Sequence, residues 1–260
     1  MKRQNVRRLS LTVSMLLFPV TLYFFSPMTA LEGAMKGVAA GSLLVFLSMF
    51  VSSLILGRAW CGWLCPGGGL QEACGGINNR RVKWKRSDTV KFVIWTPWIV
   101  AVVFFAITGG GLRSVDMLHG IPQGLFVLEG KSFVVYYITM ALIAGLAVAA
   151  GRRGFCHFVC WMSPFMIIGS RVREYFGWRA LKLRAVPESC TGCGLCSRVC
   201  PMGLDVQKMA AAGLTDDPEC ILCGECVDRC AKGAIRFSFE PGRREAVRCT
   251  AESNLEEAKG

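Results

Sequence analysis

Charged residues are scarce in this chain, and four long stretches contain none at all. Asp, Glu, Lys and Arg make up 18% of the 260 residues, against about 25% in ordinary soluble domains. The uncharged stretches are 9–31, 37–57, 92–112 and 132–151, and they contain no histidine either. Ion pumps and proton relays need ionisable groups inside the membrane. This chain by itself is therefore not expected to pump ions.

Signatures of nucleotide and nucleic-acid binding are also missing. No Gly-x-Gly-x-x-Gly sequence occurs, so binding of a nicotinamide or flavin cofactor has no support. The basic residues gather at the ends of the uncharged stretches and do not form a basic face, so we expect no nucleic-acid partner. The glycine run Gly67–Gly69 is expected to be a flexible turn. The sequence therefore offers no nucleotide-binding or nucleic-acid-binding site.

The four uncharged stretches predict four transmembrane helices. They are 20 to 23 residues long, and a helix crosses the hydrocarbon core in about 20 residues. Pro19 and Pro97 lie inside the first and third, where membrane helices tolerate kinks. The first stretch exceeds the roughly 7–15 apolar residues of a signal peptide, so we expect an uncleaved anchor. Membrane lipid is therefore an expected partner of residues 1–160.

The distribution of basic residues predicts the orientation. Four basic residues precede the first stretch, seven lie in 58–91, and Arg152 and Arg153 follow the fourth, whereas the two other loops hold three in all. Loops rich in Lys and Arg stay on the cytoplasmic side. We therefore expect a multi-pass protein of the cell inner membrane with both termini in the cytoplasm.

Charge and cysteine content divide the chain into two domains. Residues 1–184 have a formal net charge of +15, and residues 185–260 have −3. Between the spans and the cysteine-rich end, 161–184 mixes apolar and charged residues and predicts an interfacial amphipathic linker. The expected fold is thus an α-helical membrane domain over 1–160, this linker, and an α+β ferredoxin-like domain over 185–260.

Two cysteine runs in the last domain have the spacing of bacterial ferredoxins. Twelve of the fourteen cysteines fall in closely spaced sets, which favours metal ligation over disulfides. Structural zinc sites separate their two Cys-x2-Cys pairs by more than about ten residues, so zinc fits poorly. In the two-cluster arrangement the fourth cysteine of each run binds the other cluster. One [4Fe–4S] cluster is then expected on Cys190, Cys193, Cys196 and Cys230, and the other on Cys220, Cys223, Cys226 and Cys200.

A second cysteine motif occurs twice in the membrane half. Gly57-Arg58 precedes Cys61-x3-Cys65, and Gly151-Arg152-Arg153 precedes Cys156-x3-Cys160, each time after a pair of spans. This pattern predicts an internal duplication of a helical hairpin. Two interpretations stay open for the four thiols. They share a third iron–sulfur or metal centre, or they are reduced thiols or a dithiol redox pair.

The four spans, the two Cys-x3-Cys motifs and the double-cluster run resemble the NapH/MauN-type ferredoxin-like membrane proteins. Cys61 and Cys65 match as Cys-x3-Cys-Pro, whereas Trp161 replaces the proline of the second motif. The resemblance implies a role in a quinol dehydrogenase, in which electrons pass between the quinol pool and a partner oxidoreductase. It also implies that quinol and a partner redox protein bind the chain.

Quinol oxidation needs a proton acceptor, and the chain has only two histidines. His157 lies inside the second Cys-x3-Cys motif, and His119 lies in the opposite loop. Both are candidate acceptors, although a hydrogen-bonded surface histidine is the ordinary alternative. Two other functions stay open. One is a redox-sensing or cofactor-assembly membrane protein, and the other is a ferredoxin-linked subunit of a larger reductase.

Overall fold

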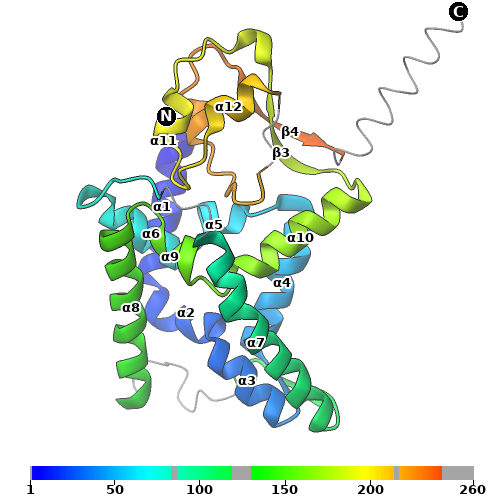
Figure 1. Ribbon diagram of the computed structural model, residues 1–260. Coiled ribbons are helices and arrows are strands. Elements are labelled where there is room, and N and C mark those ends of the chain that lie inside the picture. Colours follow the sequence, from blue (N-terminus) through cyan, green and yellow to red (C-terminus); the bar gives the residue numbers. More distant parts are fainter. Residues whose placement is uncertain (1, 83–86, 119–129, 214–216, 242–260) are drawn as a thin grey trace, which may run out of the picture. The chain divides into compact units, whose positions relative to one another are not determined.

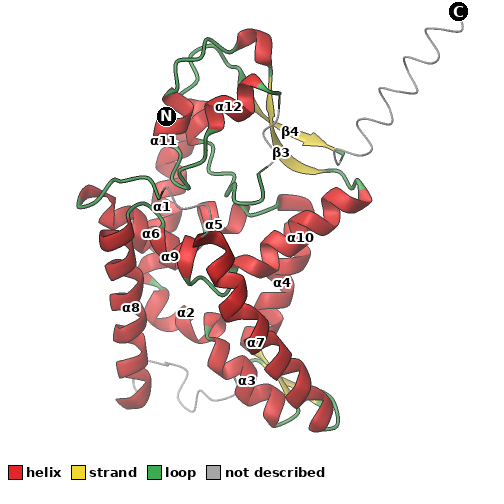
Figure 2. Cartoon of the chain, viewed as in Figure 1, coloured by secondary structure: helices red, strands yellow, loops and turns green. Residues whose placement is uncertain are grey.

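The computed structural model describes residues 2–82, 87–118, 130–213 and 217–241 (Figure 1). The chain divides into two compact units. The first comprises Lys2–Met49 and Cys61–Phe165, and the second comprises Phe50–Trp60 and the chain from Met166 onward. The first unit is mostly helical, whereas the second contains an antiparallel strand pair together with short helices (Figure 2).

The first expected span, 9–31, is not one helix. It is divided among α1 (Lys2–Leu16), α2 (Phe18–Phe25) and α3 (Pro27–Met35), and the axes of α1 and α2 differ by 82°. A proline stands in the first turn of α2 and of α3. In a first turn the missing N–H is harmless, whereas inside a continuous helix it removes a hydrogen bond. The kink expected at Pro19 is therefore a break.

The second expected span, 37–57, contains a short strand and a helix. β1 (Val38–Ala40) pairs in parallel with β2 (Ser114–Asp116), and α4 (Gly41–Leu56) follows β1. With 16 residues, α4 is about 24 Å long at 1.5 Å per residue. That length falls short of a hydrocarbon core of about 30 Å.

The third and fourth expected spans are long continuous helices. These are α7 (Ser87–Thr108), which contains Pro97, and α8 (Gly130–Ala150). Their apolar side chains face outward, as lipid-facing residues do, and Ile107 and Ile138 are 72% and 62% exposed. The described residues thus hold two helices able to cross a membrane, or three if the bent α1–α2 pair is one span. The chain is a helical membrane protein, but four spans in repeated hairpins stay a prediction.

Short helices follow α4 and α8 and hold the duplicated motif. After α4 come α5 (Ala59–Trp63), α6 (Pro66–Ala73) and the 3-10 turn η1 (Cys74–Gly76). After α8 comes α9 (Gly154–Phe158). The part of the predicted linker that is helical is α10 (Ser163–Phe176), which ends in exposed aromatic side chains.

The second unit is built on an antiparallel strand pair. β3 (Ala180–Ala185) pairs with β4 (Ile235–Glu240), with Ala180 opposite Glu240 and Ala185 opposite Ile235. Short helical elements connect the two strands: η3 (Pro187–Ser189), α11 (Leu195–Val199), α12 (Val206–Ala211) and α13 (Glu225–Asp228). Ala180 and Ile235 are almost fully buried. The ferredoxin-like strand pair therefore begins at 180, within the segment expected to be linker.

Candidate iron–sulfur sites

The cysteines of the two ferredoxin-type runs surround two cavities of the second unit. A cavity of about 240 Å³ is lined by three cysteines of the first run and the last of the second. The other cavity is lined by three cysteines of the second run and the last of the first. The sets are Cys190, Cys193, Cys196 and Cys230 in the first cavity, and Cys200, Cys220, Cys223 and Cys226 in the second. The structure thus produces the crossed grouping that two cubanes require.

Glycines in the left-handed region place the third cysteine of each run. Gly194 has φ 72° and precedes α11, which holds Cys196, while Gly224 has φ 76° and precedes α13, which holds Cys226. Glycine adopts this conformation without the clash that a Cβ causes. A Cβ at Gly194 would also come within 2.9 Å of Gln207 Oε1. The glycines therefore let the chain turn back so that the third cysteine faces the first two.

The two runs differ at the residue before their second cysteine. Gly192 has φ 70° in the first run, whereas Leu222 has φ 50° in the second. The left-handed conformation costs a non-glycine residue about 1–2 kcal/mol. Among the described residues only Leu222 and Arg153 are non-glycines with positive φ, and both lie at candidate cluster sites. Backbone strain of this kind gathers where function constrains the chain.

The two cavities also differ in exposure. In the second, Cys200, Cys223 and Cys226 are at most 8% exposed, whereas Cys193 of the first is exposed. Burial raises the pKa of Cys220 to about 12, while the backbone amide of Leu195 lowers the pKa of Cys193. Exposure and hydrogen bonds to sulfur set the potential of iron–sulfur clusters. Clusters in the two cavities are therefore expected to have different potentials.

The donor geometry does not match a site for a single metal ion. In the described parts of the chain, no three Cys, His, Asp or Glu side chains converge closely enough to hold one metal ion. A single zinc ion would draw all its thiolates to about 2.3 Å from one point. The thiolates of a cubane bind different irons and stand farther apart. The second cavity measures only about 20 Å³, so its side chains must move outward to admit a cluster.

The four cysteines of the duplicated motif come together in the interior of the first unit. Each of Cys61, Cys65, Cys156 and Cys160 is at most 5% exposed. Burial, followed by the neighbouring thiols, raises the pKa of Cys65 to about 12. A hydrogen bond with Cys156, and then burial, raises the pKa of Cys160. The two halves of the repeat therefore contribute to one group of buried cysteines, as both interpretations of the sequence require.

A half-buried carboxylate beside these thiols binds two arginines. Glu72 Oε1 accepts a hydrogen bond from Arg7 Nη1 at 2.8 Å and forms an ion pair with Arg153 Nη2. Arg153 also donates to the carbonyl of Cys61 at 2.8 Å, and Arg7 donates to that of Gly62 at 3.2 Å. Burial acts to raise the pKa of Glu72, but the two arginines hold it below its usual value. The sequence did not predict this triad, because Glu72 lies outside every motif.

Gln71 connects the two copies of the motif. Its Nε2 donates to Cys156 Sγ at 3.3 Å, and its Oε1 accepts the N–H of Phe155 at 3.0 Å. The glycine run before it belongs to helix α6 and is not the flexible turn that we expected. A side chain at Gly68 would clash with the Arg153 guanidinium. The glycines thus allow other groups to approach α6 closely.

Of the two candidate proton acceptors, the structure describes only His157. His157 is buried in α9, at 4% exposure, next to Cys156. The cavity beside the motif thiols is lined by Cys65, Cys156 and Cys160 but not by His157, and its volume is about 10 Å³. His119 lies outside the described residues. The role of either histidine stays a prediction.

Several segments match models of iron–sulfur domains. Residues 189–235 match a 4Fe-4S dicluster domain, and 171–205 match a second model with that description. Residues 38–85 and 133–179 both match a 4Fe-4S binding domain, one match in each half of the predicted repeat. The expectation of ferredoxin-type 4Fe–4S chemistry is therefore confirmed.

Curated relatives point to the same chemistry. The uncharacterized protein MJ0749 of Methanocaldococcus jannaschii is 28% identical over 72% of this chain and 67% of its own length. YccM of Escherichia coli, provisionally named an electron transport protein, is 26% identical over 80% and 58%. The nitrogen fixation protein FixG of Rhizobium meliloti is 26% identical over 74% and 41%. No solved structure matches the chain significantly.

The chain thus spans 58% of YccM and 41% of FixG, so large parts of these relatives have no counterpart in the match. None of the three carries the NapH/MauN name. Together the domain matches and these names support iron–sulfur electron transfer in a membrane protein.

Proposed function

We propose that this protein holds two [4Fe–4S] clusters in its second unit and passes electrons between membrane quinol and a partner redox protein. The crossed grouping of eight cysteines around two cavities is the observation on which the proposal depends. Each cluster, when bound, accepts and releases one electron. The protein contributes the thiolates, the left-handed glycines that aim them, and the different burial of the two sites.

The four thiols of the duplicated motif are the proposed ligands of a third centre. Its support is the burial of Cys61, Cys65, Cys156 and Cys160 in one place and the match of both halves to a 4Fe-4S binding domain. The dithiol alternative is favoured by the hydrogen bond between Cys156 and Cys160. Iron content separates the two, because two cubanes hold about eight irons and a third cubane adds about four.

The proposed location is the cell inner membrane with both termini in the cytoplasm. Its support is the excess of Lys and Arg in the N-terminus, the 58–91 segment and Arg152–Arg153. A reporter fused after Gly260 should therefore be active on the cytoplasmic side. Activity only on the opposite side would reverse the orientation and place the ferredoxin-like unit in the other compartment.

Cysteine variants test the crossed grouping directly. After anaerobic purification, Cys190→Ser and Cys230→Ser should affect the same cluster signal in electron paramagnetic resonance spectra, and Cys200→Ser and Cys220→Ser should affect the other. The double variant Cys190→Ser/Cys230→Ser should keep one cluster, whereas Cys190→Ser/Cys200→Ser should damage both. Cys74→Ser serves as the control because Cys74 belongs to neither set. Zinc in place of iron in the wild type would refute the proposal.

Quinol dependence separates electron transfer from redox sensing or cofactor assembly. Quinol added to the purified protein should bleach the visible absorption of its clusters within about a second, the time scale of enzyme turnover. A protein whose clusters respond only to a strong chemical reductant would fit the sensing or assembly alternative.

A further inference from the structure

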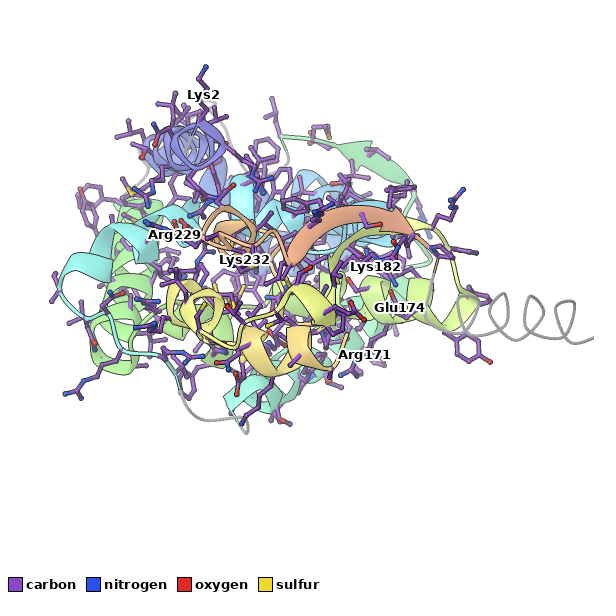
Figure 3. All side chains as sticks on the ribbon, turned by 90° about the horizontal axis from the view of Figure 1, so that it is seen from above. Lys2, Arg171, Glu174, Lys182, Arg229 and Lys232 are labelled. Atoms are coloured by element: carbon purple, nitrogen blue, oxygen red, sulfur yellow. The ribbon has the colours of Figure 1, made fainter. Side chains whose placement is uncertain are left out.

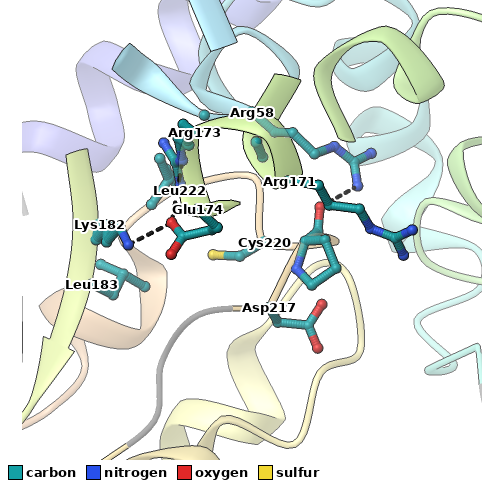
Figure 4. Close-up of a pocket in the computed structure, with 12 residues that line it drawn as sticks. Arg58, Arg171, Arg173, Glu174, Lys182, Leu183, Asp217, Cys220 and Leu222 are labelled. Atoms are coloured by element: carbon teal, nitrogen blue, oxygen red, sulfur yellow. Dashed lines mark hydrogen bonds and ion pairs between the residues drawn. The ribbon is translucent and has the colours of Figure 1, made fainter. Parts of the chain in front are cut away.

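A cavity of about 230 Å³ in the second unit borders one of the two cluster sites (Figure 4). We refer to it as the α10 cavity. Its walls come from the two residues that follow α4, from α10, from β3 and from the loop that precedes Cys223. Cys220 lines both the α10 cavity and the second cluster cavity. A molecule in the α10 cavity is therefore separated from that cluster site by a single ligand residue.

The charges around the α10 cavity largely pair with one another. Glu174 on α10 lies 2.5 Å from Lys182 Nζ on β3 and 3.5 Å from Arg173 Nε. In the view of Figure 3, Glu174 and Lys182 lie close together on their two elements. Arg58 forms an ion pair of 2.5 Å with Glu219. Three of the four lining cations, Arg58, Arg173 and Lys182, thus have carboxylate partners, and Arg171 is the fourth. Because most of its cations are paired, the cavity favours a neutral ligand that donates and accepts hydrogen bonds over a strong anion.

Apolar residues complete the walls and set the size of the ligand. Gly57, Pro218, Leu183 and Leu222 lie between the polar groups. An apolar cavity of about 150 Å³ is known to hold a benzene ring. At about 230 Å³, the α10 cavity is large enough for a six-membered ring with oxygen substituents.

The α10 cavity lies at the end of an apolar helix. α4 contains no charged residue, and Gly57, which borders the cavity, follows it directly. α10 crosses the last turns of α4 closely, because a Cβ at Gly169 would lie 3.0 Å from the carbonyl oxygen of Phe50. A ligand dissolved in lipid can approach along such a helix. By contrast, the cavity beside the Cys-x3-Cys thiols measures only about 10 Å³, too small for a ring.

We propose that the α10 cavity binds the quinol headgroup and delivers its electrons to the cluster held by Cys220. The inference rests on the proposed function and gives its substrate a site. In the balanced step, quinol loses two electrons and two protons and leaves as quinone. The electrons reduce the two [4Fe–4S] clusters by one electron each, the Cys220 cluster first. Glu174 accepts the hydrogen bond and then the proton of one quinol hydroxyl, and water receives the other proton.

The test uses the cluster-loaded protein in lipid nanodiscs under anaerobic conditions, with a short-chain ubiquinol as the probe. Glu174→Gln removes the acceptor and should slow cluster reduction at saturating quinol at least tenfold. Ser170→Phe fills the cavity and should raise the half-saturating quinol concentration at least tenfold. Matched controls outside the cavity are Glu240→Gln on β4 and Ser48→Phe on α4, which should behave like the wild type. Dithionite should reduce the clusters of every variant equally.

A photoreactive quinone supplies a second measurement that does not depend on the variants folding. In the wild type it should label peptides from 170–183 or 217–222, and excess quinol should protect them. Labelling confined to other peptides overturns the site. If quinol reduces the wild type but Glu174→Gln and Ser170→Phe match it, the site is wrong while the proposed function stands. If quinol fails to reduce the wild type although dithionite succeeds, quinol is not the donor and both proposals fall.

Discussion

The two copies of the Cys-x3-Cys motif have the same arginine in different surroundings. Arg58 and Arg153 each stand three residues before the first cysteine of their motif, and each is 1% exposed. Arg58 pairs with Glu219, which precedes the proposed cluster ligand Cys220, whereas Arg153 pairs with Glu72. The duplication kept the residue and its burial, but each arginine fixes a different site. Arg58 holds the loop of the second unit that contains Cys220, and Arg153 holds the backbone at Cys61 of the motif itself.

Of the two arginines, Arg58 should have the larger effect on stability when it is replaced. Arg58→Met leaves Glu219, itself 8% exposed, without its ion-pair partner. Removing one member of a buried pair typically costs about 3–5 kcal/mol. We expect a loss of stability of that size, together with loss of the cluster held by Cys220, measured by thermal unfolding and by iron content. An unchanged iron content would show that the pair does not position the cluster loop.

Replacement of Arg153 should cost less, because Glu72 keeps Arg7. Arg153→Met removes an ion pair and the hydrogen bond to the Cys61 carbonyl, and a hydrogen bond to a charged group contributes about 1.5–3 kcal/mol. We expect a loss of about 2 kcal/mol, and a larger loss when Arg7→Met is added than the two single losses summed. Additive losses in this double-mutant cycle would argue that the two arginines act independently.

A glycine run follows only the first motif, and replacing its glycines should change the free energy of unfolding by less than the arginine variants do. A Cβ at Gly69 would lie 2.5 Å from the Leu11 carbonyl oxygen, whereas at Gly67 its nearest neighbour is Ile143 Cδ1 at 3.5 Å. Gly69→Ala should therefore destabilise the protein by about 1–3 kcal/mol through overpacking. Gly67→Ala should stabilise it by about 0.5–1 kcal/mol, since alanine favours the helix. Chemical denaturation of both variants measures the difference, and equal effects would refute the close approach of α1.

The smallest expected effect is on the pH dependence of stability, and it concerns Glu72, the partner of Arg153 in the second copy. Arg153 and Arg7 lower the pKa of Glu72, so its contribution is present above the usual glutamate pKa of about 4.3 and is lost as pH falls through the lower folded-state value. Glu72→Gln should abolish that acid-side loss while leaving stability above pH 5 lower than in the wild type. Thermal unfolding between about pH 3 and 6 provides the measurement. A variant with the same acid profile as the wild type would contradict the assignment.

The outcome at particular residues shows where sequence patterns suffice. The spacing of the ferredoxin-type cysteines predicted a crossed ligation of two clusters. The cysteines line two cavities in that grouping, and the ligation itself stays a prediction. The span predicted over 9–31 was wrong as a single helix, because hydropathy records apolar composition and not the breaks before Pro19 and Pro27. The flexible turn expected at Gly67–Gly69 was wrong for a related reason. Glycine signals backbone freedom in a sequence, but here it provides room for neighbours of a helix.

Local sequence was enough to predict iron–sulfur chemistry and a membrane domain, since thiols at fixed spacing constrain the metal and charge-free stretches constrain the solvent through local geometry alone. The charges that surround each site depend on tertiary packing. Glu72 lies 65 residues from Arg7 and 81 from Arg153, and Glu219 lies 161 from Arg58. Pairing at such separations depends on how helices pack, and no local pattern records it. The α10 cavity is a product of the same packing, because its walls combine residues 57–58, 170–183 and 217–222.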